Sequence, residues 1–109
     1  GMKPITFLGD SLEELRAFPQ GARRAAGMQL DKVQRGLMPD NWKPMKTVGA
    51  GVCEIRTKDE SGIYRVVYIA TFAEAVYVLH AFQKKTQKTA KSDLELARSR
   101  LKDLIRRHK

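Results

Sequence analysis

The sequence has very little cysteine, because Cys53 is the only one among 109 residues. A single cysteine cannot form an internal disulfide, and no cysteines and histidines have the spacing of structural zinc ligands. Cys53 also lies in an apolar, alternating stretch, where a thiol behaves as a small buried hydrophobe. We therefore expect Cys53 to be structural, and we expect no metal and no cofactor.

Long apolar runs are missing as well. No stretch of 18 apolar residues and no signal peptide is visible, which argues against a membrane partner and against secretion. The expected location is the cytoplasm. A length of 109 residues fits one domain. We expect it to span residues 2–109, because Gly1 ahead of Met2 resembles a residue left by tag cleavage.

Acidic residues are few: 12 Asp and Glu stand against 21 Lys and Arg, a formal charge of +9. Clustered basic side chains release counterions from phosphates, so nucleic acid is the leading candidate partner. An acidic protein is also compatible. Anionic lipid usually requires an amphipathic anchor or a lipidation signal, and neither is visible. The alternative is that the charge only keeps the protein soluble and monomeric.

The first half of the chain predicts a strand and two helices. Residues 4–8 are β-like and end at Gly9, and Ser11–Glu14 has the form of a capping box that opens a helix ending near Pro19. A second helix is expected to stop near Gly36, because apolar residues recur at helical spacing. These residues are Ala22, Ala26, Leu30, Val33 and Leu37. Residues 38–51 predict a loop.

The second half predicts three strands and a helix. Residues 52–57, 63–70 and 76–82 are rich in Val, Ile and aromatics and indicate an antiparallel meander. A basic segment follows, and then a helix that Thr89 or Ser92 could cap. Its apolar face comprises Leu94, Ala97, Leu101, Leu104 and Ile105. The predicted class is α+β, a small antiparallel sheet with two N-terminal helices packed on it and a C-terminal helix.

This order of elements carries four motifs that resemble the RelE/ParE toxin superfamily over nearly the whole chain. They are Lys43–Lys46, Gly51–Arg56, Ile63–Tyr68 and Val78–Thr89. The last one resembles more narrowly the phage-related, HigB-like toxins of type II toxin–antitoxin systems. The resemblance implies a RelE-like fold, ribosome-dependent cleavage of mRNA and a helix-turn-helix antitoxin as partner. ParE-type relatives instead inhibit DNA gyrase without nuclease chemistry, and an inactive nucleic-acid or antitoxin-binding module is a third reading.

Metal-free cleavage of RNA uses the 2′-hydroxyl of the substrate as nucleophile, so the protein must supply a proton acceptor, cations and a proton donor. The resemblance places functional basic residues at Arg56, Arg65 and Lys85. Glu54 stands where RelE has a lysine, and no tyrosine follows Lys85 as it does in RelE. The base could therefore be Glu54 or His80, with Lys46 as a further candidate if it is desolvated.

Further basic residues are expected to bind RNA, and they are Lys43, Lys46, Lys84 and Lys88. Structural readings stay open: Arg56 and Glu54 could form a surface ion pair, and His80 could be a hydrogen-bonded core residue. Trp42 and Phe82 could stack on bases or fill the core. Replacing Arg56 or Arg65 by alanine is expected to relieve growth arrest with little change in thermal stability.

Overall fold

The computed structural model describes residues 2–108, so Gly1 and Lys109 lie outside the described residues. The elements in chain order are β1 (Ile5–Phe7), α1 (Ser11–Arg16), α2 (Gln20–Gln34), β2 (Trp42–Pro44), β3 (Val52–Asp59), β4 (Gly62–Ile69), β5 (Val76–Lys84) and α3 (Lys91–Arg107). Five strands form one sheet in the order β1-β5-β4-β3-β2. The predicted α+β class is confirmed.

The sheet contains the predicted antiparallel meander and two additions to it. β3, β4 and β5 pair antiparallel in sequence. β1 joins β5 in parallel, so the sheet is mixed. β2 pairs antiparallel with β3 inside the segment that was predicted to be a loop. Its three residues end in a proline, and such a strand is too short to show an alternating pattern.

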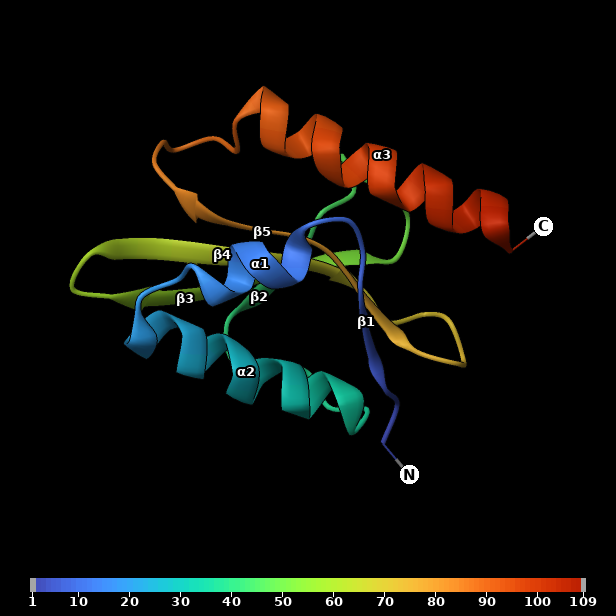
Figure 1. Cartoon of the computed structure of the whole chain (residues 1–109), viewed down its shortest axis with the longest axis horizontal. Helices are drawn as coiled ribbons and strands as arrows, with labels where there is room; N and C mark the ends of the chain where they lie inside the picture. Colours follow the sequence, from blue (N-terminus) through green and yellow to red (C-terminus); the bar gives the residue numbers. More distant parts are fainter. Residues whose placement is uncertain (1, 109) are drawn as a thin grey trace.

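The two long helices cover opposite faces of the sheet (Figure 1). Neighbouring side chains of β4 alternate between these faces: Val66 packs in the core under α2, and Val67 in the core under α3. The helices contribute their predicted apolar stripes. The buried members are Ala22, Ala26, Leu30 and Val33 from α2, and Ala97, Leu101 and Leu104 from α3.

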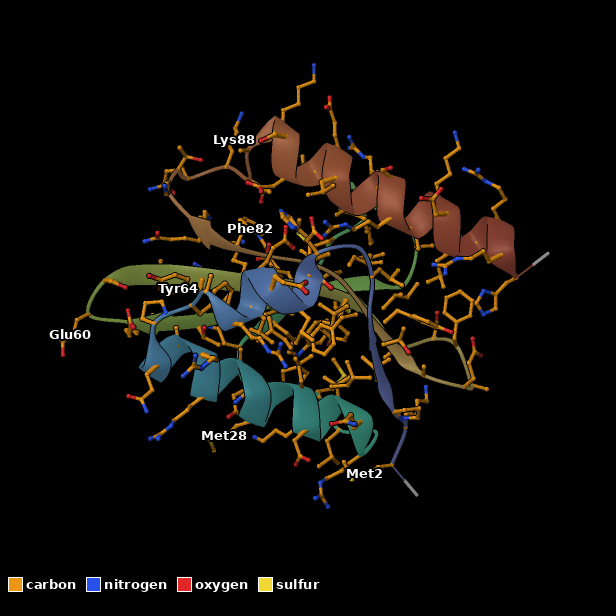
Figure 2. The ribbon with its side chains drawn as sticks, viewed as in Figure 1. Met2, Met28, Glu60, Tyr64, Phe82 and Lys88 are labelled. Atoms are coloured by element: carbon orange, nitrogen blue, oxygen red, sulfur yellow. The ribbon has the colours of Figure 1, made fainter. Side chains whose placement is uncertain are left out.

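Two residues assigned to these stripes lie outside the cores. Leu37 is exposed because α2 ends at Gln34, and Ile105 is exposed because it is on the rim of the buried face of α3. Figure 2 shows how the side chains fill the space between helices and sheet, with Met28 on the outer side of α2.

α1 lies along the edge of β5 beyond the end of β1. β1 pairs only with Val76–Val78, so the rest of this edge would leave backbone groups without partners. Ser11 Oγ donates to the carbonyl of Val78 at 3.2 Å, and the amide of Ala81 donates to Glu14 Oε1 at 3.3 Å. The predicted capping box was therefore wrong, because both side chains bond the sheet edge instead of their own helix.

The predicted cap of the last helix was also wrong. α3 begins at Lys91, so its N-cap is Ala90, whose side chain has no hydrogen-bonding group. Thr89 precedes the cap and Ser92 lies inside the first turn.

Candidate functional site

Basic side chains from four neighbouring strands lie on one face of the sheet, the face toward α3. Lys43 of β2 is opposite Glu54 of β3, and Arg56 of β3 is directly opposite Arg65 of β4. Lys84 of β5 shares this face, because it is two residues beyond Phe82, the partner of Arg65. We call Lys43, Arg56, Arg65 and Lys84 the cationic row. They lie close together because β2, β3, β4 and β5 are successive neighbours in the sheet.

Arg65 of this row forms an ion pair with Glu54, and both side chains are completely buried. Arg65 Nη1 donates to Glu54 Oε1. Among residues 2–108, Glu54 Oε2 and the Nε and Nη2 atoms of Arg65 have no hydrogen-bond partner. Burial raises the pKa of Glu54 against the effect of Arg65, and burial lowers the pKa of Arg65. The pair is thus strongly desolvated, and three of its polar atoms have no hydrogen-bond partner among the described residues.

The pairing changes how the predicted residues can act. Arg65 was predicted to contact phosphate, and its side chain has no exposed surface in this structure. Glu54 pairs with Arg65, so the alternative of a Glu54–Arg56 surface pair was wrong. Arg56, by contrast, is partly exposed and lines a hollow. Of the two predicted arginines, Arg56 is the one that a ligand can reach.

Two hollows bring the predicted lysines together. One has a volume of about 500 Å³ and is lined by Arg56, Ile63, Lys84, Lys85, Thr86 and Gln87. The other has a volume of about 680 Å³, and its lining includes Lys43, Lys46 and Lys88. Gln87 lines both, so the segment after β5 forms a wall that the hollows share. Figure 2 places Lys88 near the start of α3.

Lys84 is chemically distinct within this group. Burial and the nearby charges of Arg65, Lys43 and Arg56 lower the pKa of Lys84, because each of them disfavours another positive charge. An ammonium with a lowered pKa gives up its proton more readily than an ordinary lysine does.

His80 lies inside the protein and contacts two carboxylates. Its Nδ1 is 3.0 Å from Glu14 Oε1 of α1, and its Nε2 is 2.7 Å from Asp93 Oδ1 of α3. Arg100 Nη1 donates to the same oxygen of Glu14 at 3.0 Å and to the carbonyl of Leu79 at 2.8 Å. We call Glu14, His80, Asp93 and Arg100 the His80 cluster. Because it joins α1, β5 and α3, it holds both helices against the strand.

A β-bulge in β5 directs His80 into this cluster. Val67 pairs with His80 and the next residue, Tyr68, pairs with Val78, so Leu79 is an extra residue. The bulge puts His80 on the same face as Leu79 instead of the opposite one, and this face is the one toward α3. The structural reading of His80 as a buried, hydrogen-bonded residue matches this placement.

Three members of the His80 cluster were missed by the sequence analysis. Glu14 was assigned to a capping box, and Asp93 and Arg100 were given no role. Glu14 and His80 are 66 positions apart, so no local spacing could connect them. The only signal was a histidine in an apolar strand, which requires polar partners from elsewhere in the fold.

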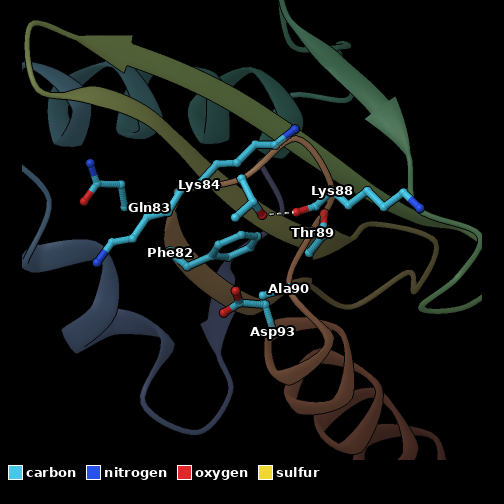
Figure 3. Close-up of a pocket in the computed structure, with 9 residues that line it drawn as sticks. Phe82, Gln83, Lys84, Lys88, Thr89, Ala90 and Asp93 are labelled. Atoms are coloured by element: carbon cyan, nitrogen blue, oxygen red, sulfur yellow. Dashed lines mark hydrogen bonds between the residues drawn. The ribbon is translucent and has the colours of Figure 1, made fainter.

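A small pocket lies between the end of β5 and the start of α3 (Figure 3). Its volume is about 110 Å³, and its lining includes Phe82, Lys84, Lys85, Lys88 and Asp93. The Phe82 ring stacks on His80 with centroids 4.9 Å apart and an angle of 17° between the planes. Phe82 therefore connects the pocket to the His80 cluster, and it packs against the core under α3 as well.

The Glu14 carboxyl makes a testable contribution to acid stability. Burial opposes its ionisation, but the hydrogen bonds and charges of His80 and Arg100 outweigh burial and hold the pKa of Glu14 below its usual value of 4.5. A carboxyl whose folded-state pKa is depressed stabilises the fold above its unfolded pKa. This stabilisation is lost as the pH falls through the folded pKa.

We therefore expect Glu14→Gln to lower the free energy of unfolding at neutral pH by about 1–3 kcal/mol, since it weakens bonds to buried groups. Urea unfolding at a series of pH values should also show a flatter acid dependence than wild type below about pH 4.5. The control is Glu13→Gln, an exposed neighbour on α1, which should keep the wild-type curve. Parallel curves for Glu14→Gln and wild type would contradict the assignment.

Two further findings concern the described part of the chain. Within residues 2–108, no three or more His, Cys, Asp and Glu side chains are arranged to hold a metal ion. None of the helices in that range combines the length and the apolar composition needed to cross a membrane.

Comparison with known proteins gives a family and a fold. The sequence model of the family described as phage derived protein Gp49-like (DUF891) matches residues 13–102, most of the chain. No curated protein matches the chain. Among solved structures, a double mutant of the E. coli toxin RelE in the free state is similar, with a TM-score of 0.65 and 17% identity over 95% of this chain and 99% of that one. This chain therefore belongs to the Gp49-like family of phage-derived proteins and has the RelE fold.

Proposed function

We propose that this protein is the toxin of a type II toxin–antitoxin system and that it cleaves mRNA on the ribosome. The observation that carries the proposal is the cationic row with its two hollows, which offers a reachable arginine and five lysines on one side of a RelE-fold sheet. Membership of the Gp49-like family and likeness to the toxin RelE support it. The narrower HigB-like assignment and the cytoplasmic location are part of the proposal.

In this proposal some side chains contact the RNA, and others hold those side chains in position. Arg56 and Lys85 lie on the scissile phosphate, because a guanidinium stays charged and can bond two phosphate oxygens at once. Lys43, Lys46 and Lys88 hold the neighbouring RNA backbone in the second hollow. The buried pair of Glu54 and Arg65 supports Arg56 from below, and His80 supports Phe82 and Asp93.

The proposed partner besides the ribosome and its mRNA is a helix-turn-helix antitoxin. The formal charge of +9 gives an acidic partner a long-range attraction that speeds association and weakens with salt. An antitoxin that covers the cationic row would block access to RNA directly.

A second candidate has a specific observation in its favour. Glu54, Arg65 and His80, three of the five predicted catalytic residues, are buried and paired. A protein that binds gyrase or nucleic acid without cutting RNA needs no accessible acid or base. This alternative keeps the fold and the charge but predicts intact mRNA.

The test is a translating extract with toeprinting of the stalled ribosomes. We expect wild-type protein to produce cuts at the ribosome, and Arg56→Ala to reduce the cleavage rate on the order of 100-fold, since it removes a preorganised donor to the phosphate. The control is Arg24→Ala, an exposed arginine of α2 on the other side of the sheet, which removes the same charge. Intact mRNA with wild-type protein would favour the binding alternative, and equal losses in both variants would mean that only net charge matters.

A further inference from the structure

Asp93 combines access to the small pocket with a fixed orientation. Among the described residues that line this pocket, it is the only one with a carboxylate, and the others include Lys84, Lys85 and Lys88. Figure 3 shows Asp93 at the start of α3, directed toward Phe82. Its side chain is 25% exposed, whereas the side chain of His80 behind it is 5% exposed. A ligand in the pocket can therefore reach Asp93 but not His80.

The contacts behind Asp93 form a chain that leads away from the pocket. Asp93 Oδ1 is 2.7 Å from His80 Nε2, and the other ring nitrogen of His80 is 3.0 Å from Glu14 Oε1. Arg100 and the Ala81 amide both donate to that Glu14 oxygen. An accessible reactive group held by a second group, which a third group orients in turn, is the arrangement by which proteins position groups for proton transfer. If the His80 cluster only stabilised the fold, Asp93 would not need to line a pocket together with three lysines.

We propose that Asp93 is the proton acceptor in RNA cleavage, with His80 as its positioning residue and Lys84 as the proton donor. This inference rests on the proposed function and assigns roles that the sequence had left open. Asp93, Lys84 and Lys85 line this pocket, whose volume is about 110 Å³, and Lys84 and Lys85 also line the hollow that contains Arg56.

The step balances with these groups alone. The Asp93 carboxylate takes the proton of the 2′-hydroxyl while the 2′-oxygen forms its bond to phosphorus. The bond from phosphorus to the 5′-oxygen breaks, and that oxygen takes a proton from the Lys84 ammonium. The products are a 2′,3′-cyclic phosphate and a 5′-hydroxyl, and Asp93 and Lys84 regain their starting states by exchanging protons with water. The lowered pKa of Lys84 suits a proton donor.

The charged groups that face Asp93 come from several elements. His80 of β5 contacts it directly, Glu14 of α1 contacts His80, and Arg100 of α3 contacts Glu14. Lys84 at the end of β5 and Lys85 and Lys88 in the following segment line the same pocket. All of these groups except Asp93 are the same in wild type and in the Asp93 variants, so a difference in the pH profile between them reports on Asp93.

The test compares Asp93→Asn with Asp103→Asn, the same substitution at an exposed position of α3. Cleavage of ribosome-bound mRNA is measured across pH, together with thermal melting and affinity for a 2′-deoxy RNA. We expect Asp93→Asn to cut about 100-fold or more slowly with little change in affinity, and to lose the acidic limb of the pH–rate profile. Asp103→Asn should match wild type. Asp93→Glu, which keeps a carboxylate, should retain that limb and part of the rate, and this variant decides the matter if Asp93→Asn is unstable.

Three results would overturn the inference. If Asp93→Asn cuts at the wild-type rate, or keeps the acidic limb, the proton acceptor is another group and the proposed function stands. If Asp93→Glu behaves as Asp93→Asn does in rate and profile, the carboxylate is not what matters there. If wild-type protein leaves mRNA intact, the proposed function fails and this inference fails with it.

Discussion

Arg65→Ala is expected to lower the free energy of unfolding by about 3–5 kcal/mol, the usual cost of removing one partner from a buried ion pair. The substitution leaves the Glu54 carboxyl buried among apolar strands without its cation. It also removes a large, fully buried side chain. Chemical denaturation should show a clear drop in the midpoint, and the cell should contain less folded protein.

The matched variants separate charge from packing. Arg56→Ala, directly opposite on β3, is the control, and its partly exposed side chain should cost less than about 1 kcal/mol. The double variant Glu54→Leu with Arg65→Met removes both charges and keeps the volume. It should be as stable as wild type or more stable by about 1–4 kcal/mol. If Arg65→Ala costs no more than Arg56→Ala, the pair is not buried in solution.

This result also separates toxicity from folding. The sequence analysis expected both arginine variants to keep nearly full thermal stability, whereas the burial of Arg65 leads us to expect a large loss of stability for Arg65→Ala. Relief of growth arrest by Arg65→Ala would then report unfolding as much as lost contact with RNA. Arg56→Ala is the variant that can test phosphate contact.

The main strands and helices could be predicted because their signals are local. The apolar residues of β3, β4 and β5 can be recognised within a few residues of sequence. Those of α2 and α3 can be recognised from their helical spacing over a few turns. The pairings of β1 and β2 could not be predicted, since strands of three residues take their partners from the tertiary fold. The capping motifs failed for the same reason: Ser11 and Glu14 found partners on β5 that a local pattern does not contain.

The sequence allowed the types of residue in the site to be predicted, but not the contacts that these residues make. Basic residues at strand ends and after β5 could be read from the sequence, and the structure gathers them in two hollows. Which cation is reachable depends on strand order: Arg65 is on β4, between β3 and β5, and is buried, whereas Arg56 lies just past the residues of β3 that pair with β2 and is partly exposed. The contact of His80 with Asp93 depends on a bulge, and one extra residue in a strand leaves no recognisable signal.

A single deoxynucleotide at the mapped cleavage position is expected to abolish the cut. In the proposed mechanism the attacking oxygen is the 2′-hydroxyl of the same nucleotide, and no group of the cationic row can replace it as nucleophile. An attacking group held in place within the substrate contributes up to about 7–11 kcal/mol to lowering the barrier, so its loss should leave no detectable product. The protein should still bind, since its contacts are to phosphate.

The measurement uses ribosomes programmed with mRNA that carries the deoxynucleotide, with the magnesium that ribosomes need. The control mRNA carries the deoxynucleotide at a neighbouring position and should be cut normally. On unmodified RNA, the upstream fragment should end in a 2′,3′-cyclic phosphate. Efficient cutting of the deoxy substrate, or a 3′-hydroxyl on the upstream fragment, would require an external nucleophile. Asp93 and Lys84 would then need to activate water, and the intramolecular mechanism would be wrong while the fold and family would stand.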